Sequence, residues 1–273
     1  MTTAVESEKS AVQAFWNAAP CGVVYANGDD LRAQLESQSQ ARYRLEPYLA
    51  DFARFGDGAG KDVLEVGVGM GADHLQWARA RPRKLVGVDL TKAGVEWTRN
   101  RLMAFDVASN VLQADAERLP FPSDSFDLVY SWGVLHHTPD TAAAIDEVHR
   151  VLRRDGVARI MIYHARSMVG YALWAKYALL RGRPFTSMKS IYARHLESPG
   201  TKAYSRAAAR KLFARFGHVQ LNVQLSFGDL LLGEAGQRHR GLLLSGARRL
   251  WPRWFIRRAM ANHGLYLLIE ATK

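Results

Sequence analysis

The chain has 273 residues, and its 37 Lys and Arg outnumber its 26 Asp and Glu, which gives a formal net charge of +11. This length is sufficient for one substantial hydrophobic core, so we expect a single compact unit. Cys21 is the only cysteine, which excludes an intramolecular disulfide and a cysteine-built metal site and indicates a reducing compartment. The N-terminus lacks the features of a secretion signal, and no apolar stretch is long enough to cross a bilayer. We therefore predict a cytoplasmic protein and leave association with a membrane surface open.

The most informative segment is Val63 to Asp73, in which an apolar run leads into Glu65 and then into three alternating glycines, Gly67, Gly69 and Gly71. Glycine adopts positive φ without steric cost, and its missing side chain lets the backbone approach a ligand closely. The segment predicts a buried strand followed by a loop that holds a nucleotide-sized cofactor.

Strand and helix signals alternate after this loop. An apolar run from Leu85 ends in Asp89, at the spacing expected for one βαβ unit. We predict further strands over 126–131, 157–163, 218–227 and 265–272, helices over 142–152 and 204–216, and a turn at 153–156. The pattern predicts an α/β fold, a Rossmann-like doubly wound sheet of seven strands with an antiparallel last strand.

Residues 56–164 resemble the core of class I S-adenosylmethionine-dependent methyltransferases, in the small-molecule branch that includes enzymes of ubiquinone and menaquinone biosynthesis. Glu65 to Gly71 resembles their first motif, Asp89 their ribose-binding acid, and Asp115-Ala116 their adenine-contacting pair. Arg153 to Gly156 is a variant of their Leu-Lys-Pro-Gly-Gly turn that lacks the proline and the second glycine. The resemblance implies S-adenosylmethionine as cofactor, with S-adenosylhomocysteine as product. It implies that the cofactor is bound by Glu65, Gly67, Gly69, Gly71, Asp89, Leu90, Asp115, Ala116, Ser131 and Trp132.

A dehydrogenase is the rival interpretation of the same loop. Gly67 to Ala72 also satisfies the dinucleotide-binding pattern, and an acid follows at the end of the next strand. The segment around Asp115, the run Leu135 to Asp140 and the lack of a separate catalytic domain fit the methyltransferase pattern better.

The sequence divides into a core and three additions. We predict an N-terminal helical lid over 1–55, the cofactor-binding core over 56–164, a substrate-covering insertion over 165–200, and the last helix and strands over 201–273. Aromatic residues in these additions are candidates for substrate contact, with packing against the core as the alternative for each. They are Trp16, Tyr25, Tyr43, Tyr171, Trp174 and Tyr204.

The segment 228–264 is predicted to form a basic amphipathic insertion. Arginines alternate with leucines and tryptophans over 238–258, and the sequence has no acid between Glu234 and Glu270. This composition suits an anionic membrane surface, but a nucleic-acid site and a merely solvated basic face are alternatives. We expect membrane rather than nucleic acid, because no RNA-binding module is recognisable.

Methyl transfer from a sulfonium needs a base only when the acceptor is protonated, as an alcohol or a phenol is. His136 and His137 follow the fourth strand and are the candidate general bases, with Tyr163, His164 and Tyr204 as substitutes. We predict no metal, because the aspartates are not spaced to converge. The sequence thus predicts methylation of a small-molecule or amphiphilic, lipid-like acceptor, with oxygen favoured over carbon. An RNA methyltransferase and a non-catalytic cofactor-binding module are the alternatives.

Overall fold

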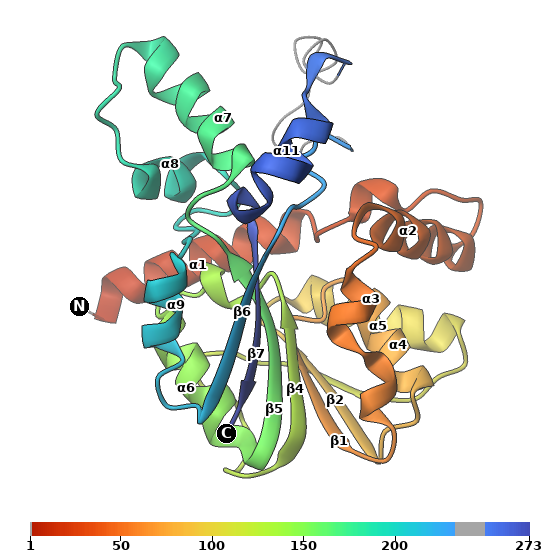
Figure 1. Ribbon diagram of the computed structural model, residues 1–273. Helices are drawn as coiled ribbons and strands as arrows, with labels where there is room; N and C mark the ends of the chain where they lie inside the picture. Colours follow the sequence, from red (N-terminus) through yellow and green to blue (C-terminus); the bar gives the residue numbers. More distant parts are fainter. Residues whose placement is uncertain (1, 233–248) are drawn as a thin grey trace.

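The computed structural model describes residues 2–232 and 249–273, which form one seven-stranded sheet flanked by helices (Figure 1). The strands are β1 Asp62–Val66, β2 Lys84–Asp89, β3 Asn110–Gln113, β4 Phe126–Trp132, β5 Leu152–Tyr163, β6 His218–Gln224 and β7 Tyr266–Thr272. Their order in the sheet is β3-β2-β1-β4-β5-β7-β6. The first five strands pair in parallel, and β7 is antiparallel to both of its neighbours. The predicted Rossmann-like sheet with an antiparallel last strand is confirmed.

Helices cover both faces of the sheet. The α-helices are α1 Thr2–Ala18, α2 Leu31–Leu45, α3 Leu49–Ala53, α4 Ala72–Arg79, α5 Lys92–Ala104, α6 Thr141–Val151, α7 Met168–Tyr177, α8 Met188–His195, α9 Arg206–Leu212 and α11 Arg253–Ala259. Short 3₁₀ turns are η1 Val23–Tyr25, η2 Phe55–Gly58, η3 Leu135–His137, η4 Leu179–Arg181 and η5 Ala261–His263. Figure 1 shows α3, α4 and α5 on one side of the strands and α6 and α9 on the other.

The core follows from these two covered faces. The central strands are apolar on both sides, as in other parallel sheets, and all five residues of β1 are buried. Helix α6 buries Ala144, Ile145, Val148 and Val151, whose spacing of three and four residues places them on one face of a helix. On the opposite side Trp77 of α4 is fully buried in a second cluster.

Strand β5 begins earlier than the sequence suggested. We predicted a turn over 153–156, but the strand starts at Leu152 and shifts register against β4 between Phe126 and Leu128. Asp155, which lies in this irregular stretch of the strand, has a positive φ of 60°. Arg153 donates to Asp62 and to Asp127, at 2.8 Å each. These ion pairs hold the segment against the neighbouring strands in place of a free turn.

The additions after β5 and after β6 lie beyond the carboxyl ends of the parallel strands. Figure 1 shows α7, α8 and α11 above that end of the sheet. The predicted basic insertion falls partly on 233–248, outside the described residues. None of the helices in the described part of the chain is long and apolar enough to span a membrane.

Candidate active site

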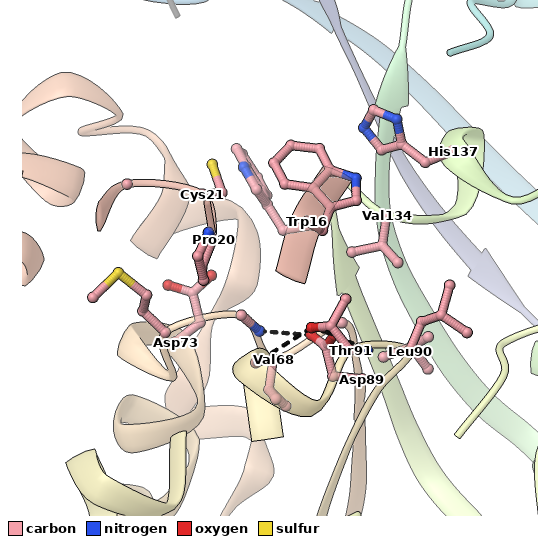
Figure 2. Close-up of a pocket in the computed structure, with 18 of the residues that line it drawn as sticks. Trp16, Pro20, Cys21, Val68, Asp73, Asp89, Leu90, Thr91, Val134 and His137 are labelled. Carbon is pink, nitrogen blue, oxygen red and sulfur yellow. Dashed lines mark hydrogen bonds between the residues drawn. The ribbon is translucent and has the colours of Figure 1, made fainter. Parts of the chain in front are cut away.

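A pocket opens at the carboxyl ends of β1, β2, β4 and β5 and has a volume of about 270 Å³ (Figure 2). It lies where strand order reverses between β1 and β4, which is the usual ligand position in open α/β sheets. Many of the predicted site residues line it. They are Trp16, Tyr25, Glu65, Gly67, Gly69, Gly71, Asp89, Leu90, Asp115, Ala116, Trp132 and His137.

The glycine loop after β1 has the backbone conformation that the sequence suggested. Gly67, Gly69 and Gly71 have φ values of 84°, 52° and 75°, in the region that favours glycine. A Cβ on Gly67 would lie 2.1 Å from Val134 Cγ2, so this glycine is required for packing. A Cβ on Gly69 would have no heavy atom of the described residues within 4 Å. Gly69 therefore borders open space that a ligand can approach.

The carboxylate of Asp89 is fixed at the end of β2. Its Oδ2 accepts the Gly69 amide at 2.9 Å, and its Oδ1 accepts the amide and the hydroxyl of Thr91 at 2.9 and 2.7 Å. A Cβ on Gly94 would lie 2.6 Å from the Asp89 carboxyl carbon, so α5 approaches as closely as glycine allows. Figure 2 shows Asp89 and Val68 on one side of the pocket and Trp16 and His137 on the other.

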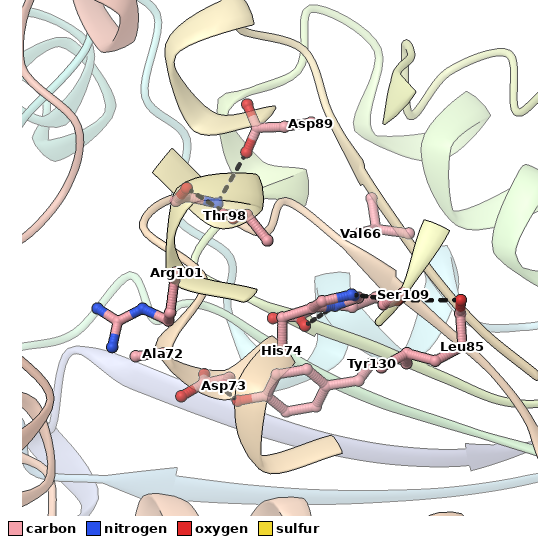
Figure 3. Close-up of polar contacts among 12 residues, drawn as sticks. Val66, Ala72, Asp73, His74, Leu85, Asp89, Thr98, Arg101, Ser109 and Tyr130 are labelled. Carbon is pink, nitrogen blue, oxygen red and sulfur yellow. Dashed lines mark hydrogen bonds and ion pairs between the residues drawn. The ribbon is translucent and has the colours of Figure 1, made fainter. Parts of the chain in front are cut away.

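Glu65 lies beneath the glycine loop and belongs to a buried polar chain. Its Oε2 is 2.9 Å from His74 Nδ1. His74 Nε2 is 2.8 Å from Ser109 Oγ, which donates to the Leu85 carbonyl at 3.1 Å (Figure 3). Burial raises the pKa of Glu65 well above its usual range and lowers the pKa of His74 to about 4. Burial therefore favours the neutral form of both groups, in which Glu65 donates to Nδ1 and Nε2 donates to Ser109.

Helix α1 crosses the edge of the pocket and contacts the predicted adenine side. The Lys9 ammonium pairs with the carboxylates of Asp115 and Glu117. One and two turns further along, Gln13 Nε2 donates to the Leu90 carbonyl at 2.9 Å, and Asn17 Oδ1 accepts the Ala93 amide at 3.2 Å. This polar stripe ties the N-terminal helix to the strand ends, and the predicted lid role of 1–55 stays a prediction.

The two candidate histidines are placed differently. His136 is fully buried, lies outside the lining of the pocket and packs its ring 4.0 Å from that of Tyr163. Burial lowers the pKa of His136 well below its usual value. His137 lines the pocket, and its Nδ1 lies 2.8 Å from Ser198 Oγ and 3.1 Å from Thr201 Oγ1. These contacts favour His137 over His136 as a group that meets a ligand.

Glu197 is a pocket residue that the sequence reasoning missed. Its Oε2 accepts the Tyr163 hydroxyl at 2.7 Å and lies 3.4 Å from His137 Nε2. A signal was present in the sequence, because Glu197 is the first acid after Asp155 and ends a long stretch with no Asp or Glu. The pocket thus holds a carboxylate, an imidazole and a phenol within contact of one another.

A second acid, Glu46, also lines the pocket and carried no sequence signal. It accepts the Tyr266 hydroxyl at 2.6 Å, and burial raises its pKa. The nearby guanidinium of Arg42 lies 3.5 Å from Glu46 and is held by Asp73, which accepts its Nε at 2.8 Å. This cation therefore already has two carboxylate partners.

Several predicted site residues lie outside the lining. Ser131 donates to the Val66 carbonyl at 2.9 Å, and Tyr43 donates to Asp73 at 3.0 Å. Three further aromatics also contact other parts of the protein outside the pocket. Tyr171 contacts His263 Nδ1 at 2.7 Å, and Trp174 donates to the Thr186 carbonyl at 3.1 Å. Tyr204 packs against the main core. Their roles toward substrate or cofactor stay predictions.

The chain matches a family model described as a methyltransferase domain over residues 64–160. That match includes the glycine loop, Asp89, Asp115 and His137, whereas the parts of the pocket from α1, Glu197 and Tyr266 lie outside it. Residues 64–160 are thus similar to a methyltransferase domain, and the sheet that they contribute to has the class I methyltransferase fold.

Curated relatives share this domain. The chain is 35% identical over 130 residues to the 27-O-demethylrifamycin SV methyltransferase of Amycolatopsis mediterranei, covering 47% of this chain and 46% of the relative. It is 34% identical over 139 residues to the fatty-acid O-methyltransferase of Mycolicibacterium smegmatis, covering 50% and 46%. The chain thus spans about half the length of these relatives.

Solved structures share the fold of the methyltransferase domain and its additions. A chain in the complex of the Haloferax volcanii Trm112 methyltransferase activator with a putative methyltransferase has a TM-score of 0.61 at 17% identity, covering 96% of both chains. An S-adenosylmethionine-dependent methyltransferase from Mesorhizobium loti has a TM-score of 0.54 at 18% identity, covering 83% of this chain and 97% of that one.

The domain family implies S-adenosylmethionine as cofactor, and the pocket fits it. The open space beside Gly69 accommodates a close approach of ligand to backbone. Asp89 stands at the end of β2, where a ribose-binding acid is expected, and Leu90 and Ala116 add apolar lining on the predicted adenine side. The residues present therefore suit a nucleoside with a polar amino-acid tail.

Proposed function

We propose that this protein is an S-adenosylmethionine-dependent methyltransferase that methylates a hydroxyl group on an uncharged, largely apolar acceptor. The observation that carries the proposal is the cluster of Glu197, His137 and Tyr163 in the wall of the cofactor pocket. Two curated relatives support an oxygen acceptor, one named for a 27-O-demethyl substrate and one for fatty acids. The second is named for an acid, so it supports oxygen and an apolar chain but not an uncharged acceptor.

The cofactor, when bound, supplies an already activated methyl group. The protein's task is therefore to align the acceptor and to keep water away from the reacting atoms. Asp89 and the glycine loop would hold the ribose and the amino-acid portion, and Asp115 and Leu90 would hold the adenine. The apolar side of the acceptor would be held by the remaining lining residues, which include Trp16, Trp132, Met161, Leu196, Phe227 and Tyr266.

His137 is the proposed proton acceptor for the hydroxyl. Its Nδ1 contacts the hydroxyls of Ser198 and Thr201, which fix the ring and leave Nε2 for a proton. The Glu197 carboxylate, 3.4 Å from Nε2, stabilises the imidazolium that results. Glu197 would thus stabilise the charged His137 ring, and by accepting the Tyr163 hydroxyl it would hold Tyr163 in place in the pocket wall.

The charge around the acceptor side argues against an ionised acceptor. Glu197 and Glu46 are the acids of this wall, and Arg42 is already held by Asp73. A carboxylate or phosphate acceptor would meet a negative or neutral surface and lose its own hydration. An alcohol or phenol can instead donate to the imidazole.

Calorimetric titration tests the cofactor. S-adenosylhomocysteine should bind wild type and bind Asp89→Ala about 10-fold or more weakly, because a hydrogen-bonded carboxylate is lost. Asp124→Ala, an exposed acid remote from the pocket, is the matched control and should bind like wild type. Binding of NAD in place of S-adenosylhomocysteine would make the loop that of a dehydrogenase.

A panel of acceptors with labelled donor tests the reaction. Long-chain alcohols and hydrophobic phenols should accept label, and fatty acids of the same length should not. Labelling of the acids alone would overturn the hydroxyl assignment. Cofactor binding without labelling of any acceptor would favour a non-catalytic binding module.

A further inference from the structure

We propose that two insertions at the pocket end of the molecule form one face that docks on an anionic lipid surface. The docking face consists of 179–185, which joins α7 to α8, and of 249–258, which includes α11. Both parts expose large apolar side chains to an unusual degree. The exposed fractions are 81% for Leu180, 99% for Phe185, 85% for Leu250 and 75% for Trp254.

Both parts of the docking face are also free of acidic residues. The sequence has no Asp or Glu between Asp155 and Glu197, and none from residue 249 to residue 269. Exposed arginines stand beside the apolar tips: Arg181 and Arg183 on the first part, and Arg257 and Arg258 on the second. Guanidinium groups beside exposed aromatic and leucine side chains match a surface of lipid phosphates over acyl chains.

The two insertions are joined at their bases and project from the same end of the sheet. The Tyr171 hydroxyl of α7 lies 2.7 Å from His263 Nδ1, shortly after α11. Asp229 accepts the Val169 amide at 3.1 Å, and its carbonyl accepts Trp251 Nε1 at 2.9 Å. Figure 1 shows α7 and α11 together beyond the carboxyl ends of the strands. The proposal therefore places both parts on the same lipid surface.

The docking face adjoins the pocket. Leu196 follows α8 and Phe227 precedes the second insertion, and both line the pocket wall. An acceptor held in the lipid layer would therefore enter from the side that docks. This link to the acceptor rests on the proposed function, whereas the docking itself does not.

A lipid surface explains the docking face better than nucleic acid does. Phosphate contacts would engage the arginines but would leave Leu180, Phe185 and Leu250 exposed to water. An acyl boundary buries these side chains as well.

Vesicle flotation tests the proposal on the full chain. We expect binding to vesicles of mixed phosphatidylcholine and phosphatidylglycerol, and weaker binding to phosphatidylcholine alone. The double variants Leu180→Ser/Phe185→Ser and Trp254→Ser/Phe255→Ser should each lower partition by about tenfold or more, because buried apolar area is lost. Met103→Ser is the control, since Met103 is 68% exposed but lies near the end of α5.

The outcomes separate the possible occupants of the docking face. Absence of vesicle binding, or equal binding by wild type and both double variants, overturns the proposal. So does a dimer in light scattering that the double variants dissociate while vesicles bind none of the proteins, and so does RNA binding without vesicle binding. All variants should bind S-adenosylhomocysteine like wild type, so a failure of docking is distinguishable from a failure of the proposed function.

Discussion

Beneath the glycine loop, Glu65 and His74 share a buried hydrogen bond, and burial favours the neutral form of both groups. Ionising either one would place an unsolvated charge in the core, since both side chains are almost fully buried. Glu65 therefore contacts His74 from below the loop, and its predicted contact with the cofactor stays a prediction. The resemblance placed Glu65 at the site, but only the structure reveals the histidine that it contacts.

The neutral pair predicts an unusual pH dependence of stability. The raised pKa of Glu65 contributes stability that is present below its ordinary value of 4.5 and is lost as pH rises through its folded value. The lowered pKa of His74 contributes stability that is present above 6.5 and is lost as pH falls through about 4. The two dependences oppose each other between pH 4.5 and 6.5.

Glu65→Gln removes the first dependence and leaves the second. Relative to wild type, its free energy of unfolding should fall as pH drops across that window, because wild type gains the stability of a protonated Glu65 and the variant does not. Urea unfolding at several pH values measures the difference in free energy of unfolding between the two proteins. The contributions of all other titrating groups are the same in both proteins and cancel in this difference. Parallel pH profiles for the two proteins would contradict the neutral pair.

Glu197→Gln tests the acceptor wall at the same scale. The amide keeps the shape of the side chain but cannot stabilise an imidazolium, so kcat should fall about 10²-fold or more. The affinity for S-adenosylhomocysteine should stay within about twofold, because Glu197 lies on the acceptor side. His136→Asn is the comparison, and an equal loss of kcat there would assign the effect to packing.

At the scale of elements, two glycines of the same loop have different roles: Gly67 packs against Val134, and Gly69 borders the open space of the pocket. Gly67→Ala should lower the free energy of unfolding by about 3 kcal/mol, because its Cβ meets Val134 and its φ is positive. Gly69→Ala carries the strain without the clash and should cost about 1–2 kcal/mol. The loss in free energy of S-adenosylhomocysteine binding in Gly69→Ala should also exceed its loss in free energy of unfolding.

Calorimetry and urea unfolding on the two variants provide the measurement. Equal stabilities would show that the Val134 contact relaxes freely. Unchanged ligand affinity in Gly69→Ala would place the cofactor away from the open side of the loop.

The sequence predicted elements better than it predicted their partners. Local signals identified the strands, because apolar runs ended at glycines and acids that a parallel sheet places at one edge. Helix α1 begins at Thr2, within the predicted helical segment 1–55. The sequence could not predict the contacts of Lys9, Gln13 and Asn17 on this helix, because each partner lies more than 70 residues away along the chain. Glu46 and Tyr266 meet across 220 residues for the same reason.

At the scale of the whole molecule, Arg159 connects the segment before β1 with both sides of the antiparallel pair. It is buried on β5, donates to the Ala53 carbonyl at 2.6 Å and to Glu270 of β7 at 3.1 Å, and pairs with Asp57. Three stretches that are distant in sequence thus share one guanidinium.

Arg159→Met should therefore lower the free energy of unfolding by about 2–4 kcal/mol, because buried polar partners lose their donor. Arg54→Met removes an arginine that pairs with the same two acids from an exposed position, and it should cost less than about 1 kcal/mol. Denaturant unfolding compares the two, and similar losses would contradict a special role for the buried arginine.

The position of β7 between β5 and β6 also fixes the order in which the molecule can be completed during synthesis. Strand β6 forms all its ladder pairs with β7, so it has no sheet to join until residues 266–272 have left the ribosome. At about 5–20 residues per second, β5 keeps an open edge for seconds while the second insertion is translated. A nascent chain stalled before Tyr266 should therefore expose that edge, and binding of chaperones to such stalled chains should end once β7 emerges.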